Sequence, residues 1–124
     1  MNGRIYQITR EQFQLMANPS FDQAEAADLS TKILVGIYAN QPLVYVGLIP
    51  LSLIDDSAYM WSIVRPEAAE HKVIFGRHAK AVVARILEFY PRLIGHSFEP
   101  SAVRWLQSLG AKFLTETEFE IRRA

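Results

Sequence analysis

The chain has 124 residues, of which 50% are hydrophobic and 11% aromatic, so it is long enough for one domain with a substantial core. Its 13 basic and 13 acidic residues give a formal net charge of zero, which argues against a nucleic-acid-binding protein, because such proteins normally carry a basic excess. Cysteine is absent, which excludes disulfide bonds, thiolate zinc sites and cysteine nucleophiles.

The N-terminal part predicts a strand followed by one or two short helices. Arg4–Arg10 alternates between two faces, as a strand does. Glu11–Ala17 has an apolar edge typical of a helix, and Asn18-Pro19-Ser20 ends it. Phe21–Leu29 is ambiguous, although its alanines favour a second short helix. No apolar run typical of a secretion signal occurs here.

The most apolar stretch, Ile33–Ile54, reaches the length of a membrane span but contains several turn-forming residues. These residues are Asn40, Gln41, Pro42, Gly47 and Pro50. They favour two strands, Lys32–Tyr38 and Leu43–Ile49, joined by a hairpin turn at 40–42, over a lipid-facing helix. We therefore expect a soluble, cytoplasmic protein.

The next predicted strand is Ala58–Val64, which follows a turn at Asp55–Ser57 and is ended by Pro66. Two adjacent carboxylates point to different faces of a strand. We therefore interpret Asp55 and Asp56 as turn residues and not as an acid–base pair.

The main helix is predicted to cover at least Arg77–Tyr90, because apolar residues recur there on one face, and Pro91 ends it. The next β-prone run is Leu93–Phe98. A short helix over 102–109 then stops at Gly110 and leads into two final strands. Terminal charges on the last strand, Phe119–Arg123, indicate a sheet edge.

A long helix lies between the predicted strands Ala58–Val64 and Leu93–Phe98, and such a crossover makes two strands parallel in one sheet. The resulting order, β–α–(α)–β–β–β–α–β–α–β–β, resembles the GNAT superfamily of N-acetyltransferases. The resemblance implies an α+β fold with a mixed central sheet of six to seven strands and flanking helices. It also implies a single domain over residues 1–124 and an acyl-CoA-dependent ancestor.

The spacing WSIVRPE…FGRHAKAVVARI…PSAVRWLQSLGAKF is also similar to a small GNAT-like group encoded by tailed phages, which includes a T7-type internal virion protein. This closer resemblance implies a phage-encoded protein in the host cytoplasm or the virion.

The family motif near the end of the chain is only partly present. Typical members have Asn, then Ala three residues later, Tyr at seven and Gly-Phe at eleven and twelve. Ala102 and Gly110 match, whereas Glu99 replaces the Asn and Leu106 replaces the Tyr. In the family that Tyr protonates the departing CoA sulfur, and leucine has no proton to give. Three other tyrosines are candidate substitutes: Tyr90, Tyr59 and Tyr45.

The family's pyrophosphate loop, Gln/Arg-x-x-Gly-x-Gly/Ala, corresponds to VRPEAAEHKVIFGRHAKAV. In the family, backbone N–H groups of this turn and of a helix N-terminus bind the CoA pyrophosphate, and glycine permits close approach. Here Gly76 is the single glycine of the segment. This departure puts the affinity for acetyl-CoA, or another acyl-CoA, in question.

Basic residues nevertheless gather around the start of the main helix: seven between Arg65 and Arg104, against four acidic ones. They favour either phosphate recognition or a solvated helix face. If the resemblance holds, the residues that contact acyl-CoA are these: Ser62, Ile63, Val64, Arg65, Lys72, Gly76, Arg77 and His78.

For catalysis, His96 lies at the end of the strand that borders the acyl-transfer cleft in this family. A histidine there could accept the proton of an attacking amine, or it could bond only to its own turn. Glu99 is a second catalytic candidate or a helix cap. His71 and His78 have no third ligand at suitable spacing, so no metal site is predicted.

Two hypotheses follow. The first is an acyl-CoA-dependent N-acyltransferase that takes an amine substrate, with backbone N–H groups near Ser62–Arg65 polarising the thioester carbonyl. The second is a catalytically inactive GNAT-like protein that binds a protein partner or belongs to a virion. Nucleic-acid binding is disfavoured.

Overall fold

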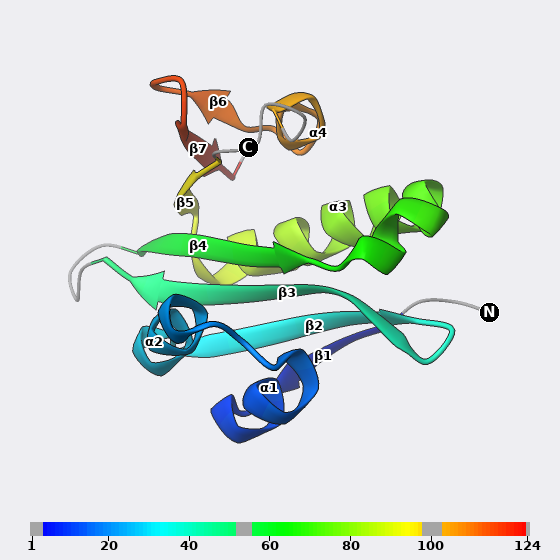
Figure 1. The fold of residues 1–124 in the computed structure, drawn as a ribbon. Coiled ribbons are helices and arrows are strands. Elements are labelled where there is room, and N and C mark those ends of the chain that lie inside the picture. Colours follow the sequence, from blue (N-terminus) through cyan, green and yellow to red (C-terminus); the bar gives the residue numbers. More distant parts are fainter. Residues whose placement is uncertain (1–3, 52–55, 98–102, 124) are drawn as a thin grey trace.

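The computed structural model describes residues 4–51, 56–97 and 103–123, which form one seven-stranded sheet with helices on both faces (Figure 1). The predicted order of elements and the α+β class are confirmed. In chain order the elements are β1 (Arg4–Ile8), α1 (Arg10–Ala17), α2 (Phe21–Leu29), β2 (Lys32–Tyr38), β3 (Gln41–Pro50), β4 (Ser57–Val64), the 3-10 helix η1 (Pro66–His71), α3 (Lys72–Phe89), β5 (Arg92–His96), α4 (Val103–Ser108), β6 (Lys112–Phe113) and β7 (Glu118–Arg122).

The strand order in the sheet is β1-β2-β3-β4-β5-β7-β6. The first four strands form an antiparallel meander, and β5 then joins β4 in parallel through the α3 crossover, as predicted. The last strand, β7, inserts between β5 and β6. The predicted edge strand, Phe119–Arg123, is thus covered by the two-residue β6 at Phe119 and Glu120, and β6 forms the edge there.

Reciprocal capping boxes fix the two N-terminal helices. Thr9 and Gln12 exchange side chain-to-backbone hydrogen bonds at the start of α1, and Ser20 and Gln23 do the same for α2. Asn18 ends α1 in the left-handed conformation, with φ 45°. These local signals make Phe21–Leu29, the ambiguous segment, a helix of its own after α1.

The β2–β3 hairpin turns earlier than the predicted 40–42. Its two central residues are Ala39 and Asn40, both with positive φ, as a tight two-residue hairpin requires. Gln41 already pairs with Tyr38 across the strands. Pro42 is tolerated in β3 because the register shifts at its partner Ile37.

Helix α3 begins at Lys72, one turn earlier than the minimum range that the sequence predicts, and follows directly from η1. It ends at Phe89, with Tyr90 as its C-cap. Figure 1 shows α3 running along one face of the sheet, with α4 beside β6 and β7.

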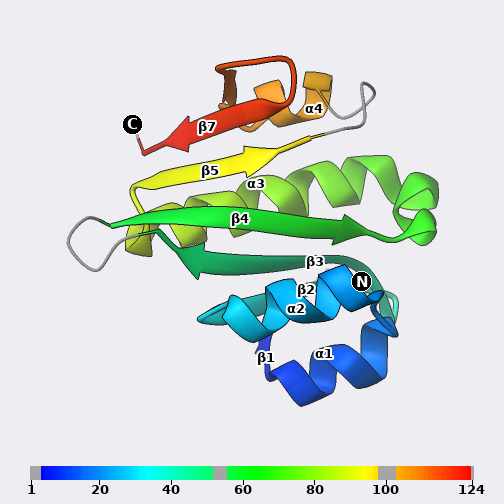
Figure 2. The same ribbon diagram turned by 60° about the vertical axis from the view of Figure 1, so that its left-hand side comes forward.

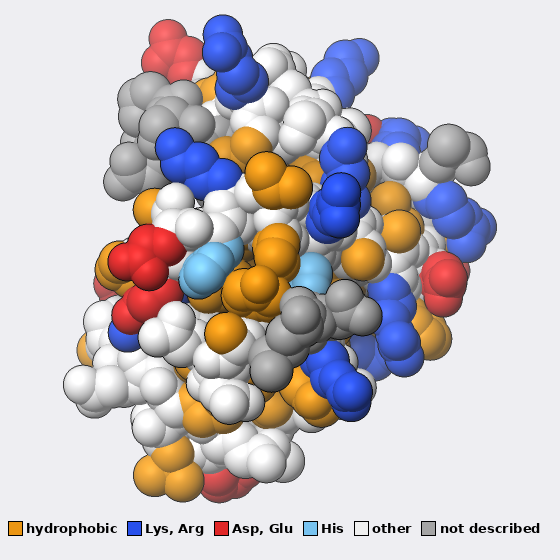
Figure 3. All heavy atoms as spheres, turned by 90° about the vertical axis from the view of Figure 1, so that its right-hand side faces the viewer, with side chains coloured by type: hydrophobic (Ala, Val, Ile, Leu, Met, Phe, Trp, Pro, Cys, Tyr) orange, Lys and Arg blue, Asp and Glu red, His pale blue; other side chains and the backbone are white. Residues whose placement is uncertain are grey.

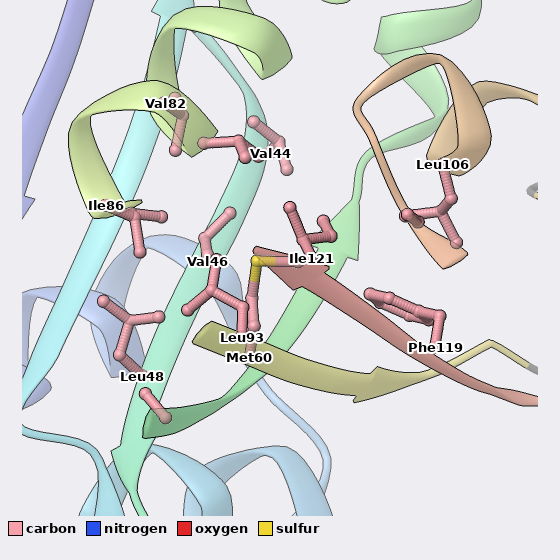
Figure 4. Close-up of a cluster of buried hydrophobic side chains, with 13 residues drawn as sticks. Val44, Val46, Leu48, Met60, Val82, Ile86, Leu93, Leu106, Phe119 and Ile121 are labelled. Atoms are coloured by element: carbon pink, nitrogen blue, oxygen red, sulfur yellow. The ribbon is translucent and has the colours of Figure 1, made fainter. Parts of the chain in front are cut away.

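The larger core lies between the sheet and α3 (Figure 4). Val82 and Ile86 of α3 face Val46 of β3, and Leu93 and Phe119 continue the cluster into β5 and β7. This core joins the meander to the C-terminal strands. The helix is therefore held by both halves of the sheet.

The second core lies on the other face, under α1 and α2. Its centre is Phe13, whose ring meets Tyr45 and Trp61 edge-on at 5.4 and 5.5 Å. The Trp61 indole lies directly over Gly47 on the neighbouring strand, in the space that a Cβ would fill. Its Nε1–H donates to Ser30 Oγ at 2.7 Å, at the end of α2.

We predict that Gly47→Ala destabilises the protein by about 1–3 kcal/mol, because the added methyl group overlaps an indole that cannot move without breaking its bond to Ser30. Urea denaturation measures the loss. Gly76→Ala is the matched control: among the described residues, no atom beyond its own stretch of helix lies within 4 Å of its Cβ position, and alanine in a helix should add roughly 0.5–1 kcal/mol. Equal stability of the two variants would contradict this packing.

An arginine pair holds the C-terminal strands together by charge. Arg92 of β5 and Arg122 of β7 are cross-strand partners, and each Nε donates to a different carboxylate oxygen of Glu120, Arg92 at 2.9 Å. The hydrogen bonds from Arg122 and then Arg92 lower the pKa of Glu120 below its usual 4.5.

Because this pKa is lower in the folded state, Glu120 should contribute stability above about pH 4.5 that is lost as pH falls through the folded-state value. We predict that Glu120→Gln lowers the free energy of unfolding at neutral pH and flattens its decline in acid. Denaturation series at neutral and acid pH check this. Glu116→Gln, at an exposed turn position, is the control and should follow the wild-type curve.

Candidate functional site

The central feature of the site is the separation of β4 from β5 (Figure 2). The described parts of these strands pair at three positions, which end at Tyr59 opposite Ile94. Beyond that point β4 continues to Val64 and β5 to His96 without pairing to each other. Meanwhile β3 pairs with β4 from Ala58 to Val64, so β4 remains a strand with one open side.

The direction of each backbone amide in this open stretch follows from strand alternation. The Arg65 N–H donates to Leu43 O at 2.8 Å, toward β3. Since successive N–H groups in a strand point to opposite sides, the Ile63 N–H also faces β3, and those of Ser62 and Val64 face the opening. Of the four residues predicted to make backbone contacts, Ser62 and Val64 are therefore the two whose N–H groups face the opening.

A cleft of about 680 Å³ lies at the opening, and residues of α3 and α4 form its other walls. Its lining is mainly apolar and includes Ser62, Val64, Val83 and Leu106. Leu106, at the motif position of the family tyrosine, is 5% exposed and offers the cleft only methyl groups.

Tyr59 is the tyrosine that meets the cleft among the three predicted substitutes. Tyr45 is completely buried in the core under α1, and the Tyr90 hydroxyl lies 3.1 Å from Thr31 Oγ1. The Tyr59 hydroxyl lies 3.2 Å from Nδ1 of His96, which also lines the cleft. Burial raises the pKa of Tyr59 above its usual 10.0, so the phenol stays protonated at neutral pH.

Glu118 completes this group, and the sequence analysis did not identify it. It pairs directly opposite His96 in the β5–β7 register, and its Oε2 lies 3.7 Å from His96 Nε2. Glu118 is identified only by its register opposite His96, and the sequence does not reveal that register. Glu99, the other predicted catalytic residue, lies outside the described residues, as does Asp55 of the predicted turn.

A second cavity, of about 540 Å³, runs between the start of α3 and α4. Lys72, Gly76 and Arg77 line it, together with Lys80 and Ser108. Four residues line both cavities and so make them adjoin: Phe75, Ala79, Trp105 and Leu109. Figure 3 shows Lys and Arg side chains spread over the face that carries the start of α3.

Three predicted cofactor residues lie outside these cavities. Ile63 packs on the core under α1 and α2, and the Arg65 side chain pairs with Glu67 at 3.8 Å. His78 turns toward the sheet beside Gly36. Gly76 lies inside α3, so it does not form a turn ahead of the helix. Within the described residues no three potential metal ligands cluster, and no helix has the length and hydropathy of a membrane span.

The fold matches solved structures of N-acetyltransferases over almost the whole chain. An IAA acetyltransferase from Bacillus cereus superposes with a TM-score of 0.73 at 10% identity, with 98% of this chain and 100% of that one covered. The chain has the GNAT fold. Mutant forms of the spermidine/spermine N-acetyltransferase SpeG from Vibrio cholerae give 0.71 at 18% identity, with 98% and 95% covered.

An N-acetyltransferase from Staphylococcus aureus gives a TM-score of 0.67 at 11% identity, with 98% and 99% covered. At such identities the likeness establishes the GNAT fold alone. No protein-family model matches the sequence, and no curated protein matches it significantly. The resemblance to the tailed-phage group stays a prediction.

Proposed function

We propose that the protein is an acyl-CoA-dependent N-acyltransferase. The observation that carries the proposal is the opening between β4 and β5, which joins an apolar cleft to a second cavity lined by basic side chains. An acyl-CoA has two corresponding parts. Its acyl and pantetheine groups form an extended arm that suits the apolar cleft, and its phosphates lie at the other end, where they suit the basic cavity.

The residues present fit such a ligand in two places. The Ser62 and Val64 amides face the open side of β4, where they can donate to the amide and thioester oxygens of the arm. Lys72, Arg77 and Lys80 supply positive charge at the adjoining cavity. Trp105 lies between the two, with its ring 5.5 Å from that of Phe75.

The reaction needs an amine nitrogen to attack the thioester carbon while the carbon–sulfur bond breaks. The amine then loses one proton, and the thiolate gains one. A preorganised amide donor stabilises the charge that develops on the carbonyl oxygen. His96 lines the cleft, and its imidazole can accept a proton from the amine.

Phosphate binding would differ from that of a glycine-rich turn. Side-chain cations on an exposed helix are screened by salt, whereas backbone amides near the ligand are screened less. We therefore expect CoA affinity to be modest and to decrease as ionic strength rises.

We predict a thermal shift with CoA and acetyl-CoA that corresponds to about 2.7 kcal/mol at 100 times the dissociation constant. Arg77→Ala should weaken binding, because it removes a charge from the second cavity. Arg85→Ala, at an exposed position of the same helix outside that cavity, is the matched control. Release of free thiol from acetyl-CoA in the presence of an amine panel then measures turnover.

No shift at millimolar CoA would remove the enzyme proposal. A second candidate is a GNAT-like binding or virion-associated protein without catalysis, as the phage resemblance implies. The observation that favours it is Leu106, which has no proton to donate, together with the missing glycine turn. CoA binding without acetyl transfer to any amine would support this candidate.

A further inference from the structure

Tyr59, His96 and Glu118 form a chain across three neighbouring strands. Tyr59 is opposite Ile94, His96 lies two residues further along β5, and Glu118 is the cross-strand partner of His96. Residues two apart on a strand share a face, so all three side chains stand on one face of the sheet. This is the face opposite α3, because the alternate residues Leu93 and Phe119 belong to the α3 core.

The contacts indicate how the protons are arranged. A carboxylate accepts hydrogen bonds and attracts positive charge, so we take the ring hydrogen of His96 to lie on Nε2, the nitrogen that faces Glu118 Oε2 at 3.7 Å. Nδ1 is then left with a lone pair. The Tyr59 hydroxyl, 3.2 Å from Nδ1, is thereby the donor in their hydrogen bond.

We propose that Tyr59 is the catalytic acid and base of this site. In this proposal His96 accepts a proton from Tyr59 and later returns it, and Glu118 is a positioning residue. The proposal rests on the N-acyltransferase function above. As the amine nitrogen attacks, its proton passes to the Tyr59 oxygen while the Tyr59 proton moves to His96 Nδ1. When the carbon–sulfur bond breaks, Tyr59 gives a proton to the thiolate and regains one from His96.

The proton count closes over this cycle. One proton leaves the amine and one reaches the thiol, so Tyr59 and His96 end in their starting states without exchange with water. Between the two steps His96 is an imidazolium, and the nearby Glu118 carboxylate stabilises that charge. Burial raises the pKa of Tyr59 and so disfavours its anion, and His96 beside it accepts the proton in its place.

The cycle also accounts for Leu106. The acid that the family places on the α4 side of the cleft is absent here, and Tyr59 approaches the same cleft from β4. Catalysis by this chain thus depends on the β4–β5–β7 register and not on the family motif that includes Leu106 and Gly110.

The test compares Tyr59→Phe and Glu118→Gln with wild type. Tyr59→Phe should lower kcat by about 10²–10⁴-fold, the usual contribution of general acid–base catalysis, and leave the KM for acyl-CoA nearly unchanged. Glu118→Gln should lower kcat by about tenfold, as an electrostatic partner would. Tyr38→Phe is the matched control, because Tyr38 also contacts a histidine, His71, but away from the cleft.

Nitrogen NMR spectra of the His96 ring give a readout that does not depend on activity. We expect hydrogen on Nε2 in the neutral ring, and a shift of the Nδ1 signal in Tyr59→Phe. A wild-type kcat in Tyr59→Phe, or hydrogen on Nδ1, would overturn the relay while leaving the enzyme proposal intact. A wild-type protein that neither binds CoA nor acylates any amine would instead overturn the proposed function, and the relay with it.

Discussion

The structure depends on one constraint: β4 stays paired with β3 along its length while β5 turns away after Tyr59. Gly95 lies at the point of separation. A Cβ there would lie 3.0 Å from the Met60 carbonyl oxygen and would overlap the Phe119 ring. The missing side chain lets the Phe119 ring lie against Gly95 and line the cleft. The cleft and the amides of β4 that face it follow from this separation.

The binding and chemical parts of the site rest on different physical supports. The basic cavity is built from long exposed side chains on α3, whose charges act through water. The Tyr59–His96–Glu118 chain is built on strands whose register the Arg92–Glu120–Arg122 cluster secures a few residues away. Geometry is therefore more tightly held at the proposed proton relay than at the basic cavity.

The sequence predicts the order of elements because the hydrophobic periods, Pro91 and Gly110 are local signals. The parallel crossover follows from chain order alone. The sequence gives only a minimum range for α3, because η1 continues into it without a capping side chain and no residue marks the boundary. The hairpin at Ala39 was missed because alanine rarely adopts positive φ.

Part of the site was also predictable, because the order of the elements follows from the sequence. The sequence indicates His96 and the cleft strand through their places in the element order. It does not indicate Glu118, whose role arises from the pairing of β5 with β7 across a long chain separation. His78 points toward the sheet and not into either cavity, and this likewise depends on the rotational orientation of α3 above Gly36.

Both tryptophans of the chain border the cleft, Trp61 from β4 and Trp105 from α4. One indole is fixed by its bond to Ser30, and the other rests edge-on against Phe75. Indole fluorescence responds to the polarity of its surroundings, so a ligand that enters the cleft would change the emission of both rings at once. Intrinsic tryptophan fluorescence can therefore report whether the cleft is occupied, without an attached dye.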